Sequence, residues 1–290
     1  MNIHVSHPCA FCPGVKRVVE KTLKIIDDYK SSHIYLIGSI VHNTELNKQL
    51  LKHKNVKILE NKNNDRLALV KSIKTERNVI IFSAHGTDQK AIDYADAKGW
   101  KIFDLTCPFV ARILFKIENA ILSGFHVAYF GDKNHVEAIA AKAKGKDNLT
   151  VYRTKKDLKK VLDKPYVQVV SQTTMNEQEY IATQKWFTPP AIIKFSNTIC
   201  ASSKQRQENA LTSKKYDLVF VISDPKSHNG VSLYEVLKQR QKHVVFVDPL
   251  HIKINRKILK NKKDCAIFTS SSVSQEQVDR FVKALNKALA

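Results

Sequence analysis

Three cysteines recur at nearly equal spacing, and each lies between a short apolar run and a helical pattern. Cys107 follows the run that ends at Asp104, and it precedes Pro108, which suits the first position of a helix. Cys12 and Cys200 have the same setting, 95 residues before and 93 residues after Cys107. Because a helix N-terminus favours negative charge, it favours the thiolate form of a cysteine. The spacing therefore predicts three structural repeats, each presenting one thiolate.

Short apolar runs alternate with helical patterns along the whole chain, which is typical of βα units and parallel sheets. The 290 residues, 43% of them hydrophobic, are enough for more than one packed core. We expect an α/β protein with three similar small domains of mainly parallel sheet, arranged pseudo-threefold around one central site. The predicted domains are the consecutive segments 1–106, 107–199 and 200–290.

Two further polar loops follow strands in each predicted repeat. They are Val41–Asn43, Ser83–Gly86, Asp132–His135, Ser171–Thr174, Lys226–Asn229 and Thr269–Ser272. Ligands of parallel sheets bind beyond the carboxyl ends of strands, so we expect these loops around the central site. The segments Thr174–Glu177 and Ser274–Gln277 fit the capping box, and helix N-termini there would favour a phosphate.

Three thiolates without a fourth suggest a metal centre with one open position. Soft thiolates select zinc or an iron–sulfur cluster, and both remain open at this point. Cys9 and Cys12 also form a C-x-x-C pair of the thioredoxin type, but the threefold pattern uses Cys12 and leaves Cys9 over. We interpret Cys265, inside an apolar run, as a buried core thiol.

Four histidines, His42, His85, His135 and His228, fall in the predicted central loops. Histidine can donate to phosphate oxygens and titrates near neutral pH, although ordinary loop histidines are the alternative. Glu137 comes two residues after His135. If burial raises its pKa, this carboxylic acid can deliver a proton; the alternative is a solvated glutamate on the first turn of a helix.

The net charge of +21 comes from 39 lysines and nine arginines against 27 acidic residues. The lysines are scattered, and the sequence has no basic tract interleaved with aromatics, helix-turn-helix signal or zinc-finger spacing, so we expect no specific binding of nucleic acid. A basic surface suits a small acidic protein such as an electron carrier. The sequence has no membrane-length apolar run, and Met1 to Phe11 lacks a secretory apolar region; we expect a soluble cytosolic protein with no membrane contact.

Several motifs, in order from the first strand to the last helix, resemble the 4-hydroxy-3-methylbut-2-enyl diphosphate reductase family. They are Phe11-Cys12-Pro13-Gly14-Val15, Val41-His42-Asn43, Phe82-Ser83-Ala84-His85-Gly86, Asp104-Leu105-Thr106-Cys107-Pro108, Gln172-Thr173-Thr174, and Ile199-Cys200 followed by Arg206-Gln207-Glu208. The resemblance implies three α/β domains around one [4Fe–4S] cluster, with Cys12, Cys107 and Cys200 on three irons. The fourth iron is then open to the substrate hydroxyl.

The resemblance also implies roles for the loop residues. His42, His85, Ser227 and Asn229 match positions that hold the diphosphate. His135, Glu137 and Thr173 match the group around the substrate hydroxyl, with Glu137 delivering the proton. Two electrons, from ferredoxin or flavodoxin, and two protons then remove the hydroxyl as water and leave isopentenyl and dimethylallyl diphosphate, the last step of the non-mevalonate pathway.

The chain departs from the family pattern at a few positions. Ala10 replaces a usual Gly, and Val136 replaces the Pro of a His-Pro-Glu motif. In the predicted diphosphate pocket, His228 replaces a Ser, and a late Ser aligns with Val273, next to Ser272. We therefore count His228 and Ser272 among the candidate substrate-binding residues. These departures keep two alternatives open: a diverged paralogue with the same cluster that reduces another substrate, and a non-catalytic metal-binding module that binds a partner.

Overall fold

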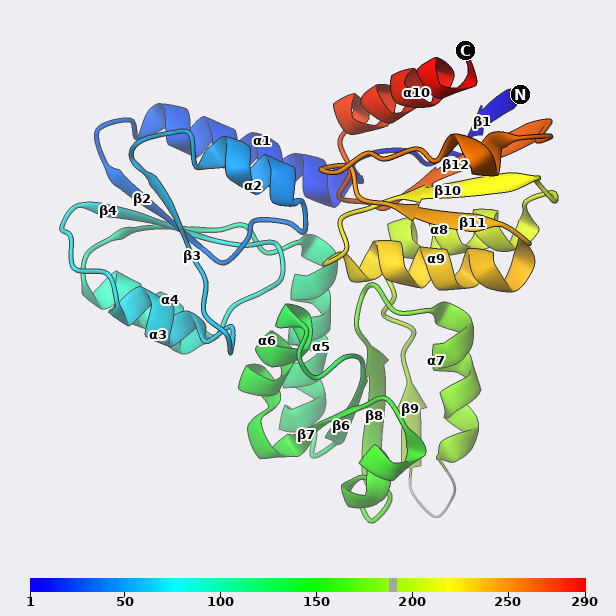
Figure 1. Cartoon of the computed structure of the whole chain (residues 1–290). Coiled ribbons are helices and arrows are strands. Elements are labelled where there is room, and N and C mark those ends of the chain that lie inside the picture. The colour runs from blue at the N-terminus through cyan, green and yellow to red at the C-terminus, as the bar shows by residue number, and fades with distance from the viewer. Residues whose placement is uncertain (188–191) are drawn as a thin grey trace. The chain divides into compact units, whose positions relative to one another are not determined.

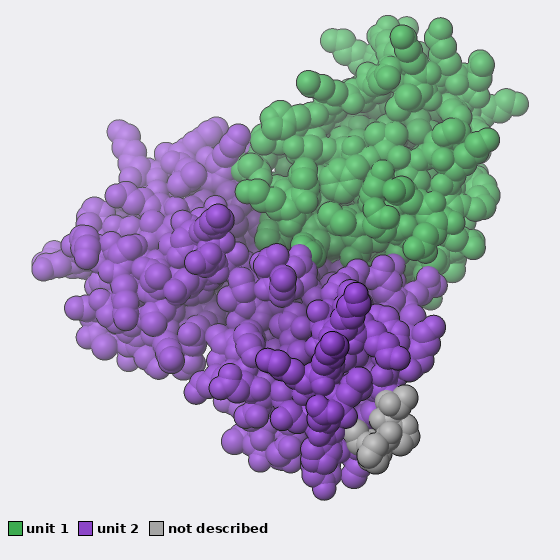
Figure 2. All heavy atoms as spheres, turned by 60° about the horizontal axis from the view of Figure 1, so that its bottom comes forward, with its two compact units in different colours: residues 1–16, 42–46, 200–290 green, residues 17–41, 47–199 purple. Residues whose placement is uncertain are grey.

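The computed structural model describes residues 1–187 and 192–290, which contain three four-stranded sheets with helices packed on them (Figure 1). Every strand pair is parallel, as in the α/β class predicted from the sequence. The chain forms two compact units, green and purple in Figure 2. Unit 1 comprises residues 1–16, 42–46 and 200–290, and unit 2 comprises residues 17–41 and 47–199. None of the described helices is both long and apolar enough to span a membrane.

One sheet of unit 2 has the strand order β3-β2-β4-β5. Its central strands are buried along almost their whole length because helices cover both faces. Tyr35, Ile37 and Phe82 pack against α3 and α4, while α1 and α2 run along the opposite face (Figure 1). The elements are β2 (His33–Ile37), β3 (Val56–Leu59), β4 (Asn78–Phe82), β5 (Lys101–Asp104), α1 (Pro13–Asp28), α2 (Thr44–Leu50), α3 (Arg66–Lys71) and α4 (Gln89–Ala97).

The second sheet of unit 2 has the order β7-β6-β8-β9. Alternate side chains of its central strands point to opposite faces, as the period of a strand requires. Phe130 packs toward α7, whereas Tyr129 packs toward α5 and α6. The elements are β6 (His126–Phe130), β7 (Leu149–Tyr152), β8 (Tyr166–Ser171), β9 (Ile192–Phe195), α5 (Pro108–Leu122), α6 (Val136–Gly145) and α7 (Glu177–Thr183), with short 3-10 segments at Lys146–Asn148, Lys155–Lys160 and Gln184–Trp186.

The sheet of unit 1 has the order β1-β12-β10-β11. Phe220 and Ile267 pack against α10, and Val221 and Phe268 pack against α8 and α9 on the other face. The elements are β1 (Asn2–Val5), β10 (Leu218–Ile222), β11 (Val244–Val247), β12 (Asp264–Thr269), α8 (Ala201–Thr212), α9 (His228–Arg240) and α10 (Gln275–Leu289), with a 3-10 segment at Arg256–Leu259.

The three sheets share one topology. In each repeat the first strand lies between the second and the third, and the fourth strand pairs with the third and forms an edge of the sheet. The strands before Cys107 and Cys200 are the edge strands β5 and β9, and the equivalent edge strand of the remaining sheet is β1, which precedes Cys12. The repeat is therefore circularly permuted along the sequence.

This permutation corrects the predicted division at 1–106, 107–199 and 200–290. Strand β1 pairs with β12, from Asn2 beside Asp264 to Val5 beside Ile267, so the N-terminal segment belongs with residues 200–290. Residues 42–46, which comprise two loop residues and the first three residues of α2, also belong to unit 1. The prediction assigned β1 to the segment that follows it, because the alternation of strands and helices does not reveal which sheet an edge strand joins.

One of the two predicted capping boxes is confirmed, and the other is wrong. Ser274 caps α10 with the full capping box, in which Gln277 reciprocates, as predicted. By contrast, α7 begins at Glu177, and the side chain of Asn176 accepts the N–H of Glu179. Asn caps helices as well as Thr does, so Asn176 displaced the predicted Thr174 from that role.

Candidate active site

Each of the three predicted cysteines lies at the start of a helix. Cys107 and Cys200 are the N-cap residues of α5 and α8, and Cys12 directly precedes α1. In unit 1, the backbone N–H of Val15 points to the sulfur of Cys12 at 3.4 Å, and the N–H of Ser203 points to the sulfur of Cys200 at 3.4 Å. Backbone N–H groups that point at a sulfur are the means by which a helix N-terminus stabilises negative charge.

The other two cysteines are poorer ligands. Burial raises the pKa of the Cys9 thiol, although a hydrogen bond from Thr269 opposes the shift. Cys265 is fully buried in β12, and burial raises its pKa to about 11, which confirms the predicted core thiol. Both shifts favour the neutral thiol over the thiolate that a metal requires.

Arg206, a buried residue in the middle of α8, connects that helix to the Cys12 loop. Arg206 donates to the carbonyl of Ala10 at 2.6 Å and to the carbonyl of Thr269 at 3.0 Å. Burial lowers the pKa of Arg206, and negative charge on Cys12, Cys9 and Cys200 opposes that shift. The guanidinium therefore lies within electrostatic reach of the sulfurs of unit 1. The sequence had marked Arg206 only as part of a motif, without a role.

The same contacts explain how Ala10 replaces the usual Gly. Ala10 has φ +59°, in the left-handed region where a side chain costs about 1 kcal/mol. Its N–H donates to Thr269 Oγ1 at 3.0 Å and its carbonyl accepts from Arg206. Since both backbone groups are bonded, the surroundings hold Ala10 in this conformation.

The sulfurs of Cys12 and Cys200 are the ligand type that a soft metal prefers, but unit 1 supplies only these two of the predicted three. Cys107 belongs to unit 2, where its N–H donates to the carbonyl of Ala84 at 2.9 Å. Within either unit, as far as the structure describes it, no three His, Cys, Asp or Glu side chains gather around one metal position.

The polar loops of unit 1 place hydroxyl and amide groups together. Ser272 Oγ lies 3.4 Å from Ser227 Oγ, and Asn229 accepts the N–H of Ser271 at 2.9 Å. Asn43 donates to the carbonyl of Ser272 at 2.7 Å, which joins the loop of His42 to these residues. The predicted residues Ser227, Asn229 and Ser272 are therefore neighbours within one unit. His228, half-buried, is the first residue of α9.

The structure separates the roles of Ser272 and Val273. Ser272 faces Ser227, whereas Val273 is 1% exposed and packs in the core with Val278 and Phe281. Val273 is therefore a core residue, and Ser272 is the one of the two that faces the polar cluster.

An acidic residue that sequence reasoning missed lies beside His42. Asp224 accepts the backbone N–H of Thr44 at 2.6 Å and that of Lys226 at 2.9 Å. Burial disfavours its charge, but these bonds and the nearby His42 together lower its pKa. Asp224 lies two residues beyond the end of strand β10, so its position in a loop after a strand was the signal that could have identified it.

In unit 2, Glu137 is buried and held by Thr173. The carboxylate accepts from Thr173 Oγ1 at 2.6 Å and from the Thr173 N–H at 3.0 Å. Burial raises the pKa of Glu137 to about 7, against the opposing effect of these two bonds. His135 caps α6, because its Nδ1 accepts the N–H of Glu137 at 3.2 Å. The alternative of a solvated glutamate is wrong: Glu137 is 4% exposed.

A second histidine joins this group. The rings of His85 and His135 meet edge to face with centroids 6.1 Å apart. His85 follows β4 and His135 follows β6, and Thr173 follows β8. The three loops come from both sheets of unit 2, as expected for residues at the carboxyl ends of parallel strands.

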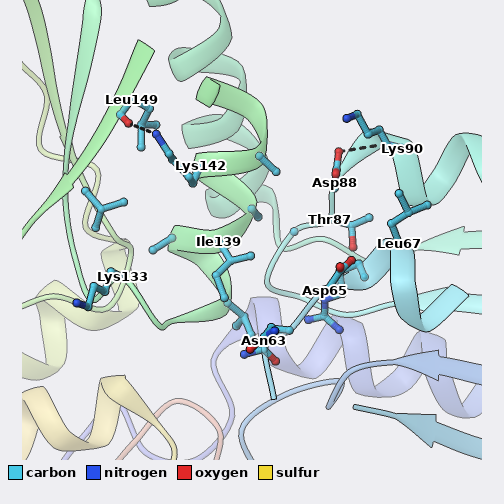
Figure 3. Close-up of a pocket in the computed structure, with 18 of the residues that line it drawn as sticks. Asn63, Asp65, Leu67, Thr87, Asp88, Lys90, Lys133, Ile139, Lys142 and Leu149 are labelled. Carbon is cyan, nitrogen blue, oxygen red and sulfur yellow. Dashed lines mark hydrogen bonds between the residues drawn. The ribbon is translucent and has the colours of Figure 1, made fainter. Parts of the chain in front are cut away.

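Unit 2 also contains a pocket of about 810 Å³ (Figure 3). Ile139 and Lys142 of α6 line one side, and Thr87, Asp88 and Lys90 line the other. Its walls include the residues that follow His85 and His135 in the chain but neither histidine, nor Glu137 or Thr173. The pocket is therefore distinct from the group around Glu137.

Known proteins resemble this chain along nearly its whole length. The LytB protein family model matches residues 3–286. A 4-hydroxy-3-methylbut-2-enyl diphosphate reductase of Malacoplasma penetrans (strain HF-2) is 33% identical over 274 residues, covering 89% of this chain and 90% of the relative. One of the same name from Caldanaerobacter subterraneus subsp. tengcongensis is 29% identical over 250 residues, covering 86% and 84%.

Two solved structures have the same fold. The E-1-hydroxy-2-methyl-but-2-enyl-4-diphosphate reductase of Plasmodium falciparum has a TM-score of 0.85 at 24% identity, over 98% of this chain and 88% of that one. An (E)-4-hydroxy-3-methyl-but-2-enyl diphosphate reductase has a TM-score of 0.66 at 23% identity, over 99% and 100%. These likenesses concern the arrangement of helices and strands.

The raised pKa of Glu137 makes stability depend on pH. Because folding favours the neutral acid, its contribution is full below the ordinary pKa of 4.5 and is lost as pH rises through about 7. Glu137→Gln lacks this titration. Urea unfolding between pH 4.5 and 8 should show wild type losing about 3 kcal/mol relative to the variant. Parallel profiles for the two proteins would contradict a buried neutral Glu137.

Proposed function

Since the chain belongs to the LytB protein family, we propose that it is a 4-hydroxy-3-methylbut-2-enyl diphosphate reductase. It takes two electrons and two protons, removes the substrate hydroxyl as water, and yields isopentenyl and dimethylallyl diphosphate. This is the last step of the non-mevalonate route to isoprenoid precursors. The observation that carries the proposal is the buried acid Glu137, held by Thr173 next to His135.

We propose that Cys12, Cys107 and Cys200 hold one [4Fe–4S] cluster whose fourth iron stays open to the substrate. The helix N-termini at all three cysteines and the N–H donors to Cys12 and Cys200 support thiolate ligands. When bound, the cluster would supply the electrons and a Lewis-acidic iron for the hydroxyl oxygen.

Glu137, His135 and Thr173 surround the substrate hydroxyl in this proposal. With a pKa of about 7, Glu137 is still largely protonated just below neutral pH and can give that proton to the leaving oxygen. Thr173 fixes the carboxyl with two bonds, which keeps the proton donor in one orientation. Nδ1 of His135 accepts the N–H of Glu137 and so sets the start of α6.

The diphosphate is assigned to the remaining loop residues, which are His42, His85, Ser227, His228, Asn229 and Ser272. The hydroxyl and amide groups of unit 1 are close enough to one another to serve one anion. His228, at the first position of α9, offers a donor that can become charged, in place of the Ser of the family pattern. The altered pocket therefore keeps the donor types that a diphosphate needs.

We assign electron supply to a small acidic carrier, ferredoxin or flavodoxin, that binds the basic surface. The net charge of +21 supports this partner because opposite charges steer association. We further place the enzyme in the cytoplasm, where reducing conditions keep thiolates available for a cluster. Immunodetection in fractionated cells tests the location, and a membrane-bound or secreted pool would contradict it.

The cluster ligands can be tested by iron analysis. Serine variants of Cys12, Cys107 and Cys200 should each lose most of their iron, because a hard hydroxyl replaces a soft thiolate. Cys9→Ser and Cys265→Ser are matched controls and should keep it. The readouts are iron and sulfide content and absorption near 400 nm of anaerobically purified protein. If Cys9→Ser lost the cluster while Cys200→Ser kept it, the ligand set would be wrong.

The proton donor and the reaction can be tested together. Wild type with a chemical reductant should convert 4-hydroxy-3-methylbut-2-enyl diphosphate into both products, and Glu137→Gln should lower turnover by about 10²–10⁴-fold with unchanged iron content. Product analysis by mass spectrometry provides the measurement. Cluster-loaded wild type without turnover would favour a paralogue with another substrate, and colourless zinc protein would favour a binding module.

The carrier can be tested through salt. Turnover with ferredoxin or flavodoxin should fall as ionic strength rises, because exposed charges more than about 8 Å apart are largely screened at physiological salt. A small chemical reductant provides the control and should respond much less. The same salt response with both reductants would rule out electrostatic docking.

A further inference from the structure

A buried arginine in unit 2 contacts the carboxyl ends of the two central strands of its first sheet. Arg66, the first residue of α3, is 7% exposed. It donates to the carbonyl of Ile37, the last residue of β2, and to Ser83 Oγ at 3.2 Å, just beyond the end of β4. In the order β3-β2-β4-β5, these are the two central strands, and ligands of open parallel sheets bind beyond such a junction.

The fold makes room for this guanidinium. Gly38 has φ +82°, and a Cβ there would lie 1.8 Å from Arg66 Nη1. Glycine at this position therefore serves both the backbone turn and the side chain of Arg66. Among the residues that the structure describes, no carboxylate forms an ion pair with Arg66, although Glu60 is near enough to raise its pKa slightly against the larger effect of burial.

Ser83 connects Arg66 to a predicted substrate-binding residue. Ser83 Oγ lies 3.3 Å from Nδ1 of His85, and both side chains are buried. The three residues thus form a short chain from the guanidinium through the hydroxyl to the imidazole.

Arg66 determines the direction of the hydrogen bonds that join it through Ser83 to His85. A guanidinium has donors only, so Ser83 Oγ must accept from Arg66. The hydroxyl proton then needs an acceptor. Ser83 is 0% exposed, and within the described chain the only other partner of its hydroxyl is His85 Nδ1. If Nδ1 carried a proton, the buried hydroxyl proton would be left without an acceptor, which is unfavourable.

We propose that Arg66 is a positioning residue that acts through Ser83 to hold His85 with its proton on Nε2. Neutral imidazole has one donor and one acceptor nitrogen, so an accepting Nδ1 leaves Nε2 as the donor. A diphosphate offers only acceptors, so the Nε2–H tautomer is the one that can bind it without a change of protonation. The proposal rests on the assignment of His85 to the diphosphate.

The first test reads the tautomer directly and needs no substrate. In ¹⁵N-histidine-labelled, cluster-loaded protein at pH 8, the Nδ1 and Nε2 shifts of His85, assigned by comparison with His85→Gln, should report the Nε2–H form. Arg66→Met removes the donors at similar size, so Ser83 can reverse and the Nδ1–H form should appear. Arg112→Met, a change at an exposed arginine of α5, is the control and should leave the shifts unchanged.

A second variant keeps the test decisive if Arg66→Met does not fold. Ser83→Ala deletes one oxygen, leaves Arg66 in place and removes the link to Nδ1, so it should also mix the tautomers of His85. Arg66→Lys restores a donor and should recover the Nε2–H form in part. The proposal would be overturned if His85 in wild type were protonated on Nδ1 or on both nitrogens. It would also be overturned if neither Arg66→Met nor Ser83→Ala changed the tautomer of His85.

The second test measures anion affinity with inorganic pyrophosphate by calorimetry. Arg66→Met and Ser83→Ala should weaken binding by about tenfold, the value of one hydrogen bond to a charged group, and should raise KM far more than they lower kcat. Arg112→Met should bind as wild type does. If the variants change the tautomer of His85 but not the pyrophosphate affinity, the control of His85 by Arg66 through Ser83 is supported and the assignment of His85 to the diphosphate fails. If the affinity falls without a change of tautomer, the proposed control through Ser83 is wrong.

Discussion

The pairing of the first strand with the last is the contact on which unit 1 depends. Strand β1 has only four residues and alternates between exposed and half-buried positions, so it has little core of its own. Its parallel bonds to β12 place the Cys12 loop beside Ser271 and Thr269, and the N–H of Cys12 donates to the Ser271 carbonyl at 3.1 Å. Arg206 then fastens the same loop to α8. Without this pairing, Cys12 and Cys200 would share no unit.

A single geometric rule accounts for the candidate residues of both units. In parallel sheets all carboxyl ends lie at one edge, so a polar loop after each strand adds a functional group to the same edge. Buried strands need apolar side chains on both faces, which leaves the loops as the place for polar chemistry. Glu137 shows the consequence: it is held against β8's loop by Thr173, shielded from water, and its pKa is shifted by that shielding.

The α/β class and most strand ends could be predicted from the sequence, because short apolar runs and helix starts are local signals. The predicted loops Ser83–Gly86, Ser171–Thr174 and Thr269–Ser272 begin where β4, β8 and β12 end. The sheet partner of β1 could not be predicted, since pairing over more than 250 residues leaves no local mark. The burial of Arg66 and Arg206 could not be predicted for a related reason: a lone charged residue in a basic chain is known to be buried only once its neighbours in space are known.

The permuted order of the repeats also constrains how the chain matures during synthesis. Strand β1 and Cys12 are synthesised before their partner β12, which lies more than 250 residues later in the sequence. The sheets β3-β2-β4-β5 and β7-β6-β8-β9 are each encoded in one stretch and can assemble as they emerge, since domains fold as units during translation. Strand β1 stays without its sheet partner until β12 has been synthesised. The surroundings of Cys12 are therefore completed only after β12 is made, and a truncated chain that lacks β12 never forms them.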